Sequence, residues 1–190
     1  MNTEPSKTDQ DDRFAEMLAR LPEGCRRLVD EHRQAFDTAP GSSHLHQAWP
    51  GGFRDHLNEV FLLADTLYQS LRQIRPLPFT LDSADLVLFI HDLEKPFKYT
   101  DTVLFADQPQ LATSDPEAFK NRIVETYQIP LTSEESNAIK YIHGEGDDYS
   151  KTTRIMGRLA AFCHSCDLLS ARLWFDQPEQ RQRIQADGGG

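Results

Sequence analysis

The stretch LVLFIHDLEKP, residues 86–96, carries the clearest signal in this chain. Its first five residues are apolar, as expected for a helix that faces a core on every side. His91 and Asp92 follow directly, and Pro96 favours an end to the helix just before it. Burying polar groups without partners costs roughly 2–7 kcal/mol for a neutral group and far more for a lone carboxylate. A partner must therefore compensate His91 and Asp92, and a metal ion is one candidate.

Helical periodicity recurs along the rest of the chain, with no internal repeat and no period-2 alternation typical of strands. We therefore expect an all-α fold, a single helical bundle over residues 13–176. A loose tail is expected at 1–12, which is polar and acidic, and another at 177–190, which ends in glycines. The expected helices cover about 13–37 with a break at LPEG, 52–74, 83–94, 116–127, 133–143 and 152–175. The connection at 96–114 is long enough to be a lid or to contain an extra short helix.

Composition limits the classes of function. The formal net charge of −10 argues against a protein that wraps long nucleic acid, because such binding depends on many Lys and Arg contacts to phosphates. No apolar run is long enough to cross a bilayer, and the N-terminus lacks the apolar core of a signal peptide, so we expect a cytoplasmic protein that does not bind membranes.

Three cysteines do not suggest a disulfide framework. Cys163 and Cys166 fall on the core stripe of the last expected helix, as small buried residues.

Polar residues recur where apolar helix faces end. His56 lies at the edge of the stripe in 52–74, and His143 lies at the end of 133–143. His164 and Asp167, three residues apart, share a second face of the last helix with alanines that leave space beside them. One such residue alone is more often a cap or a hydrogen-bonded core residue than a ligand. Together with His91 and Asp92 they form a set of imidazole and carboxylate ligands, which favours a metal site between the helices.

The same positions resemble the HD superfamily of metal-dependent phosphohydrolases. The order His56, His91-Asp92 and Asp167 matches the order of the family motif. The resemblance extends over HQAWPGGFRDHLNEV, HDLEK, YIHGEG and CHSCDLLSA, within residues 44–171, and is nearest to the catalytic domains of bacterial HD-type 3′-to-5′ exoribonucleases. Glu94 departs from the family pattern, which has a glycine at this position.

The resemblance implies a hydrolase that cleaves a phosphomonoester or phosphodiester bond in a nucleotide or short oligonucleotide, through a hydroxide formed on a divalent metal. The metal would be Mn, Fe, Co, Ni, Zn or Mg, with one or two ions per chain. His56, His91, Asp92 and Asp167 would hold the first ion. His143 and His164 match the ligands of a second ion in the dinuclear branch, with Asp92 bridging.

The resemblance also implies roles around the metal. Asp92 and Lys95 are the expected catalytic residues, and Lys95 would also bind phosphate, although a solvated cation at a helix end is an equally good interpretation. The candidate substrate-binding residues are His46, Arg54, Lys95, Lys151 and Arg154.

Two alternatives to a hydrolase remain open at this point. A mixed-valence di-iron oxygenase would use the same six ligands, and a nucleotide-sensing HD module would keep the site without turnover. The expected partner is a small phosphorylated or nucleotide-like molecule. The sequence leaves the oligomeric state open, a homo-oligomer included.

Overall fold

The protein is all-α. The computed structural model describes residues 7–173, with side chains from Phe14 onward, and shows no strand within this range. The expected C-terminal tail lies outside the described residues, and so does the first half of the expected N-terminal tail. The helices are α1 (Lys7–Arg20), α2 (Glu23–Glu31), α3 (Arg33–Thr38), α4 (Gly52–Ile74), α5 (Leu81–Ile90), α6 (Lys95–Lys98), α7 (Leu111–Ser114), α8 (Pro116–Thr126), α9 (Ser133–Tyr141), the 3₁₀ turn η1 (Gly146–Asp148) and α10 (Arg158–Leu173).

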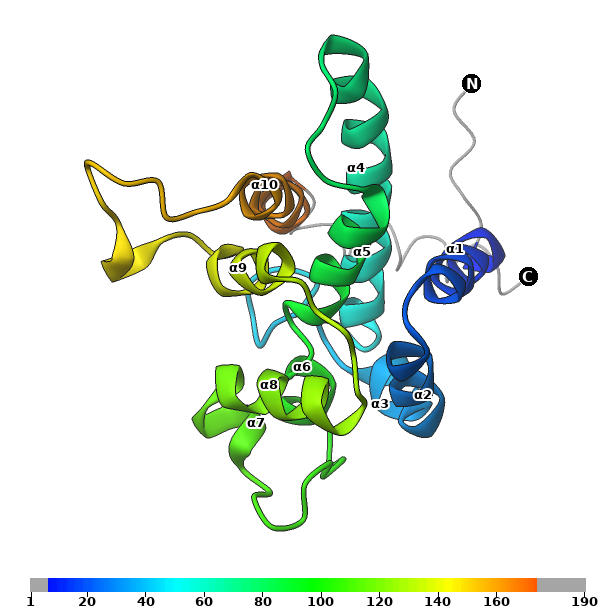
Figure 1. Cartoon of the computed structure of the whole chain (residues 1–190). Helices are drawn as coiled ribbons and strands as arrows, with labels where there is room; N and C mark the ends of the chain where they lie inside the picture. Colours follow the sequence, from blue (N-terminus) through cyan, green and yellow to red (C-terminus); the bar gives the residue numbers. More distant parts are fainter. Residues whose placement is uncertain (1–6, 174–190) are drawn as a thin grey trace.

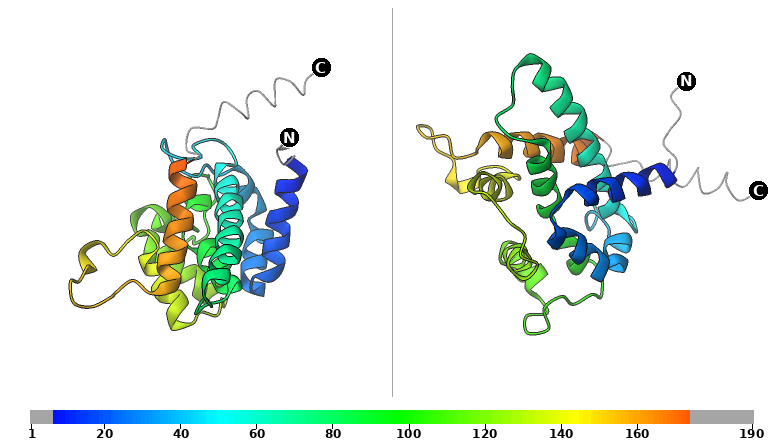
Figure 2. Two further views of the ribbon diagram at one scale, coloured as in Figure 1. Left: turned by 90° about the horizontal axis from the view of Figure 1, so that it is seen from above. Right: turned by 45° about the vertical axis from the view of Figure 1, so that its right-hand side comes forward.

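Helix α5 forms the centre of the bundle. It packs on α4, α9 and α10, and the residues from Ala84 to Ile90 are all buried, as expected from an apolar run without a polar side. Figure 1 shows α4 beside α5, α9 and α10 on one side, α1 to α3 on the other, and α6 to α8 beyond the C-terminal end of α5. The two further views in Figure 2 show the same grouping. The end of α5 that carries His91 therefore points into the bundle.

Several helix boundaries differ from the expected ones. The expected helix at 13–37 is three helices, α1 to α3, and α1 begins at Lys7, inside the expected tail. The first break falls at Leu21 and Pro22, because a proline is accommodated most easily before or at the first turn of a helix. Helix α5 ends at Ile90, and a turn at 91–94 leads into α6, which has Pro96 in its first turn.

The last helix begins at Arg158, so the expected start near residue 152 is wrong. Side chains of neighbouring segments take the backbone hydrogen bonds that a helix would have used. The Asn137 amide of α9 donates to the Ile155 carbonyl and accepts from the Gly157 N–H, and Glu145 accepts from the Met156 N–H. The end of this connection, residues 155–157, is therefore held against α9 and the turn that follows it. Figure 1 shows the rest of the connection extending away from the bundle before α10 begins.

The long connection after α5 was expected to be either a lid or a segment with an extra short helix. It contains two short helices, α6 and α7. Its apolar residues Phe97, Phe105 and Ala112 belong to the core, together with Phe119 of α8. In the described part of the chain, no helix is long and apolar enough to span a membrane.

Candidate metal centre

Four of the predicted ligands come together in one buried group. His56 comes from α4, His91 and Asp92 from the turn after α5, and Asp167 from α10. One ligand atom from each lies within 4.8 Å of all the others. His56 and His91 are fully buried, and the side chains of Asp92 and Asp167 are 6% and 14% exposed. Residues far apart in the sequence therefore present nitrogen and oxygen donors to one point.

The separations between these donors suit a single ion. The Nε2 atoms of His56 and His91 are 3.3 Å apart. His56 Nε2 lies 3.6 Å from Asp92 Oδ2 and 3.4 Å from Asp167 Oδ1, and His91 Nε2 lies 3.0 and 3.6 Å from the same two atoms. Two donors bound to one ion at 2.0–2.3 Å can be at most about 4.6 Å apart, so small side-chain shifts suffice for coordination. The cluster can therefore hold a metal ion.

Two glycines at the start of α4 allow the preceding loop, residues 39–51, to lie close to His56. A Cβ atom on Gly52 would lie 1.9 Å from the Gln47 carbonyl oxygen, a distance that no side chain tolerates. Gly51 has a φ of +79°, in the left-handed region that glycine adopts without strain. These two glycines let the loop pack directly on the helix, which places the His46 ring 5.5 Å from that of His56.

Outer hydrogen bonds fix the direction of both buried imidazoles. His91 Nδ1 lies 2.6 Å from the Leu88 carbonyl oxygen, so this nitrogen donates and Nε2 faces the cluster. His56 Nδ1 lies 3.0 Å from Ser170 Oγ, which donates in turn to Glu59 Oε2 at 2.7 Å. Because the serine gives its proton to Glu59, its oxygen accepts the proton of His56 Nδ1. The free Nε2 of His56 therefore also faces the cluster, as in histidines that bind metals.

The cluster contains two buried carboxylates, Asp92 and Asp167, whose pKa values are both lowered. Burial alone would raise the pKa of Asp167, but hydrogen bonds from His143, His56 and His91 hold it far below its usual range. Burial would likewise raise the pKa of Asp92, and the charges of His91 and Lys95 keep it well below that range. Both aspartates are therefore ionised and can act as metal ligands.

The pKa values of the two buried histidines, His56 and His91, shift in opposite directions. Burial lowers the pKa of His56 to about 4. Burial also acts to lower the pKa of His91, but its contact with Asp92 outweighs this and raises the pKa to about 10. The extra proton of the cluster therefore resides on His91, whose Nε2 lies 3.0 Å from Asp92 Oδ2. A cation bound between the carboxylates would take the place of this proton.

Lys95 already places a positive charge at the cluster. Its Nζ atom lies 2.5 Å from Asp92 Oδ2, and its side chain is 11% exposed. Burial acts to lower the pKa of Lys95, but the Asp92 carboxylate raises it above the usual value, so the ammonium remains charged. Burial lowers the pKa of His46, and the Lys95 charge acts in the same direction, so the neutral form of this imidazole is favoured.

His143 and His164 lie beside the group of four rather than within it. His143 Nδ1 is 3.3 Å from Asp167 Oδ2, and its Nε2 is 3.7 Å from Asp92 Oδ1. Each aspartate therefore turns one oxygen towards His56 and His91 and its other oxygen towards His143. His164 Nδ1 lies 2.5 Å from the Ile142 carbonyl oxygen, so this nitrogen donates, and Nε2 has no partner among the described residues. His143 and His164 both line the neighbouring cavity.

That cavity has a volume of about 390 Å³ and adjoins the cluster. Of the predicted substrate-binding residues, His46 lines it and Lys95 lies at the cluster itself. The structure does not bring Arg54 there. The Arg54 side chain pairs with Asp37 of α3 and stacks on the Phe14 ring of α1 at 4.6 Å, so it links α4 to the first helices.

Lys151 and Arg154 are not at the cavity either. Both are exposed in the connection before α10, and neither is among the described residues that line the cavity. The expected start near residue 152 would have placed Arg154 on the last helix, whereas α10 begins at Arg158.

Sequence reasoning missed the residues that support the cluster. Gln47 is fully buried, and its amide donates to Glu59 at 2.6 Å, so it belongs to the same hydrogen-bonded group as Ser170. Glu59 follows His56 by three positions and Ser170 follows Asp167 by three, the spacing of neighbours on one helix face. That spacing is the signal in the sequence from which both could have been found.

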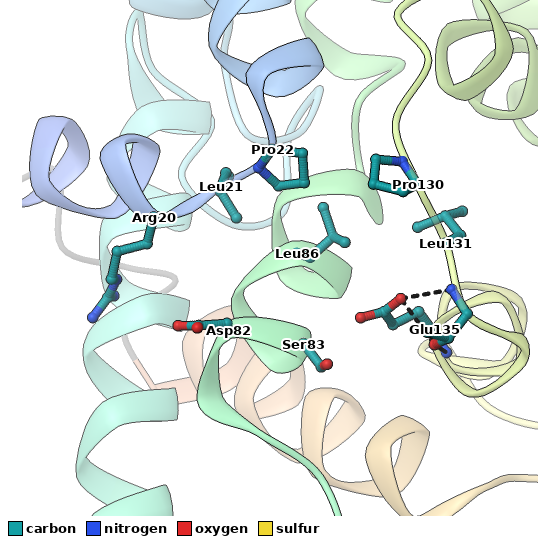
Figure 3. A pocket seen from close by; sticks show the side chains of 10 residues that line it. Arg20, Leu21, Pro22, Asp82, Ser83, Leu86, Pro130, Leu131 and Glu135 are labelled. Carbon is teal, nitrogen blue, oxygen red and sulfur yellow. Dashed lines mark hydrogen bonds between the residues drawn. The ribbon is translucent and has the colours of Figure 1, made fainter.

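A second cavity, of about 610 Å³, lies near the other end of α5 (Figure 3). Figure 3 shows apolar side chains around it, among them Leu21, Leu86 and Leu131. Two of its charged residues have structural partners. Arg20 pairs with Asp85 at 2.8 Å, and Glu135 accepts the hydrogen bonds of a capping box from Thr132. This cavity therefore offers no group of ligands like that at the other end of α5.

Comparisons of the chain with protein-family models, with curated proteins and with solved structures find no match. What the chain does must therefore be argued from the cluster and the cavity beside it.

Proposed function

We propose that the chain is a metal-dependent phosphohydrolase of the HD type, which cleaves a phosphoester bond in a nucleotide or a short oligonucleotide. The observation that carries this proposal is the buried group of His56, His91, Asp92 and Asp167. Its members follow the sequence order of the HD motif and lie at the separations that one ion requires.

The ligand set supports a divalent ion such as Mn, Fe, Co, Ni, Zn or Mg, because imidazole and carboxylate ligands suit these ions. An ion bound here would lower the pKa of a coordinated water and offset negative charge on a phosphoryl group. His143 and His164, with the outer oxygens of Asp92 and Asp167, provide donors for a second ion. A dinuclear centre is therefore part of the proposal.

The chain's own residues would bind and orient the phosphate. Lys95 contacts Asp92 at the cluster, and its ammonium can donate hydrogen bonds to phosphoryl oxygens. The His46 ring lies 5.5 Å from that of His56 and lines the same cavity, so it borders the space that the phosphate would occupy. The outer hydrogen bonds through Ser170 and Leu88 hold the imidazoles in place before any ligand arrives. Such preorganisation is a large part of catalysis in electrostatic sites.

The decisive experiment joins metal analysis to a substrate panel. Purified chain is analysed for bound metal and then assayed, with added Mn²⁺, on nucleoside monophosphates, cyclic nucleotides, dinucleotides and p-nitrophenyl phosphoesters. We expect bound divalent metal and metal-dependent release of phosphate or nucleotide. Iron with oxygen consumption and no hydrolysis would replace the proposal with an oxygenase, and binding without turnover across all the metals would replace it with a sensor.

A further inference from the structure

The cavity beside the cluster has a second half that the proposed chemistry does not use. Beyond the histidines and Asp167, it is lined by Leu45 of the 39–51 loop and by Leu168, Ala171 and Arg172 of α10. Leu45 is 67% exposed and Leu168 is 46% exposed, although both are large apolar side chains. Single exposed leucines are ordinary, but these two come from different segments and line the same cavity. They form an apolar surface for part of a ligand.

Arg172 lies at the far end of this surface. It follows Asp167 by five residues, which corresponds to about 7.5 Å along the helix axis. On a helix it lies about 40° from Leu168 and about 80° from His164, so the three side chains emerge from one side of α10. Within the described part of the chain, no carboxylate pairs with Arg172, and its side chain is exposed. No described carboxylate therefore competes with an anion for this guanidinium, which lies at a distance from the cluster.

The charge of the cavity differs from that of the whole chain. The formal net charge of the chain is −10, yet Asp167 is the one carboxylate among the described residues that line this cavity. The other polar groups are three imidazoles, of His46, His143 and His164, and the guanidinium of Arg172. An ion bound to Asp167 would offset that carboxylate. The cavity therefore suits an anionic ligand with an apolar segment, and its volume is within the usual range for small-molecule sites.

We propose that the cavity binds a nucleotide with two phosphate groups, one at the cluster and one at Arg172, with a base or sugar against Leu45 and Leu168. The substrate class is that of 5′-phosphorylated dinucleotides rather than nucleoside monophosphates. This inference rests on the proposed function for its first phosphate, whereas the second phosphate is argued from Arg172 alone. Arginine suits the role because its guanidinium binds phosphate oxygens through two parallel hydrogen bonds.

The test compares the dinucleotide TpT with its 5′-phosphorylated form pTpT. Affinities are measured by calorimetry on full-length, Mn²⁺-treated protein, and initial rates are recorded in parallel. We expect the wild type to bind pTpT about tenfold more tightly than TpT, as one charge-assisted contact provides. Arg172→Gln should bind the two equally. Arg158→Gln is the matched control, because Arg158 is an exposed arginine at the start of the same helix and does not line the cavity.

A second variant tests the apolar surface. Leu168→Ala should weaken TpT and pTpT alike, by about fivefold, because it removes apolar contact without changing charge. Equal binding of both dinucleotides by the wild type, or an unchanged preference in Arg172→Gln, would overturn the inference. Hydrolysis of TpT without any preference for pTpT would overturn it and leave the proposed function standing. A preference lost in Arg172→Gln, with no hydrolysis of any phosphoester, would support the second phosphate site and contradict the proposed function.

Discussion

Ser170 joins His56 to Glu59: its Oγ atom lies 3.0 Å from His56 Nδ1 and donates to Glu59 Oε2 at 2.7 Å. All three side chains come from α4 and α10, the helices that also carry the first and last ligands of the cluster. The serine therefore determines which nitrogen of His56 faces the cluster.

Removing this link should weaken metal binding without removing a ligand. In Ser170→Ala the imidazole of His56 loses its acceptor and can rotate or change tautomer, so the affinity for Mn²⁺ or Zn²⁺ should fall by about 10- to 100-fold. Ser165→Ala is the control, because Ser165 is exposed on the same helix and donates to its own helix at Ala161. Calorimetric titration of both variants checks this, and equal affinities would show that Ser170 does not position His56.

Removing a ligand should have a larger effect. We expect Asp92→Ala to lose bound metal and turnover together, because the remaining ligands of the group are two neutral donors and one carboxylate. Asp101→Ala replaces an exposed aspartate of the connection after α6 and should behave as the wild type. Elemental analysis and the phosphoester assay on both variants test the assignment. Retained metal with retained activity in Asp92→Ala would refute it.

The number of ions depends on His164. If the centre is dinuclear, His164→Ala should reduce the bound metal from about two ions per chain to about one and strongly reduce turnover. The position of His143 between the outer oxygens of Asp92 and Asp167 favours this outcome. If one ion is bound, the metal content should remain near one and the loss should appear mainly in substrate affinity. Wild type and variant are prepared with the same metal supplement and compared by elemental analysis.

Asp85 should make the stability of the fold depend on pH. Its side chain is 1% exposed, its Oδ1 has no hydrogen-bond partner among the described residues, and burial raises its pKa to about 7 in spite of Arg20. Between about pH 4 and pH 7 the folded chain holds a proton on Asp85 that the unfolded chain releases. This contribution to the free energy of unfolding therefore falls as the pH rises, by up to about 4 kcal/mol across the window.

Asp85→Asn should remove this slope, since the amide does not titrate. Urea unfolding at pH 5 and pH 8 measures it, with Asp101→Asn as the control at an exposed site of the connection after α6. We expect the loss of stability between the two pH values to be smaller in Asp85→Asn than in the wild type and in Asp101→Asn. The same loss in all three proteins would contradict the role of Asp85.

The sequence predicts those parts of the structure that depend on the local spacing of apolar residues and on the glycines and prolines at helix ends. The bounds of α4 agree with the expected 52–74, because a long apolar stripe follows PGG and ends shortly before Pro76. The four candidate ligands could be grouped because each is a polar side chain at the edge of an apolar helix face. The start of α10 could not be predicted, because side chains of α9 and of the following turn hold the preceding segment.

Arg54 shows a second limit of sequence reasoning. It precedes His56 by only two residues, but two positions on a helix correspond to about 200° of rotation, so the two side chains leave α4 on opposite sides. Which side faces the site depends on the packing of α1 and α3 against α4. Proximity to a ligand in the sequence therefore does not place a residue at the site unless the helix face is known.

The cluster also has a consequence for the connectivity of the chain. His56 and Asp167 are separated by roughly 110 positions, and their helices, α4 and α10, pack directly on each other. An ion that binds both would act as a crosslink across most of the chain, and closing so long a loop restricts the unfolded ensemble more than closing a short one. Because such an ion binds the folded form in preference, the lifetime of the protein in a cell would follow the supply of the metal as well as the strength of the core.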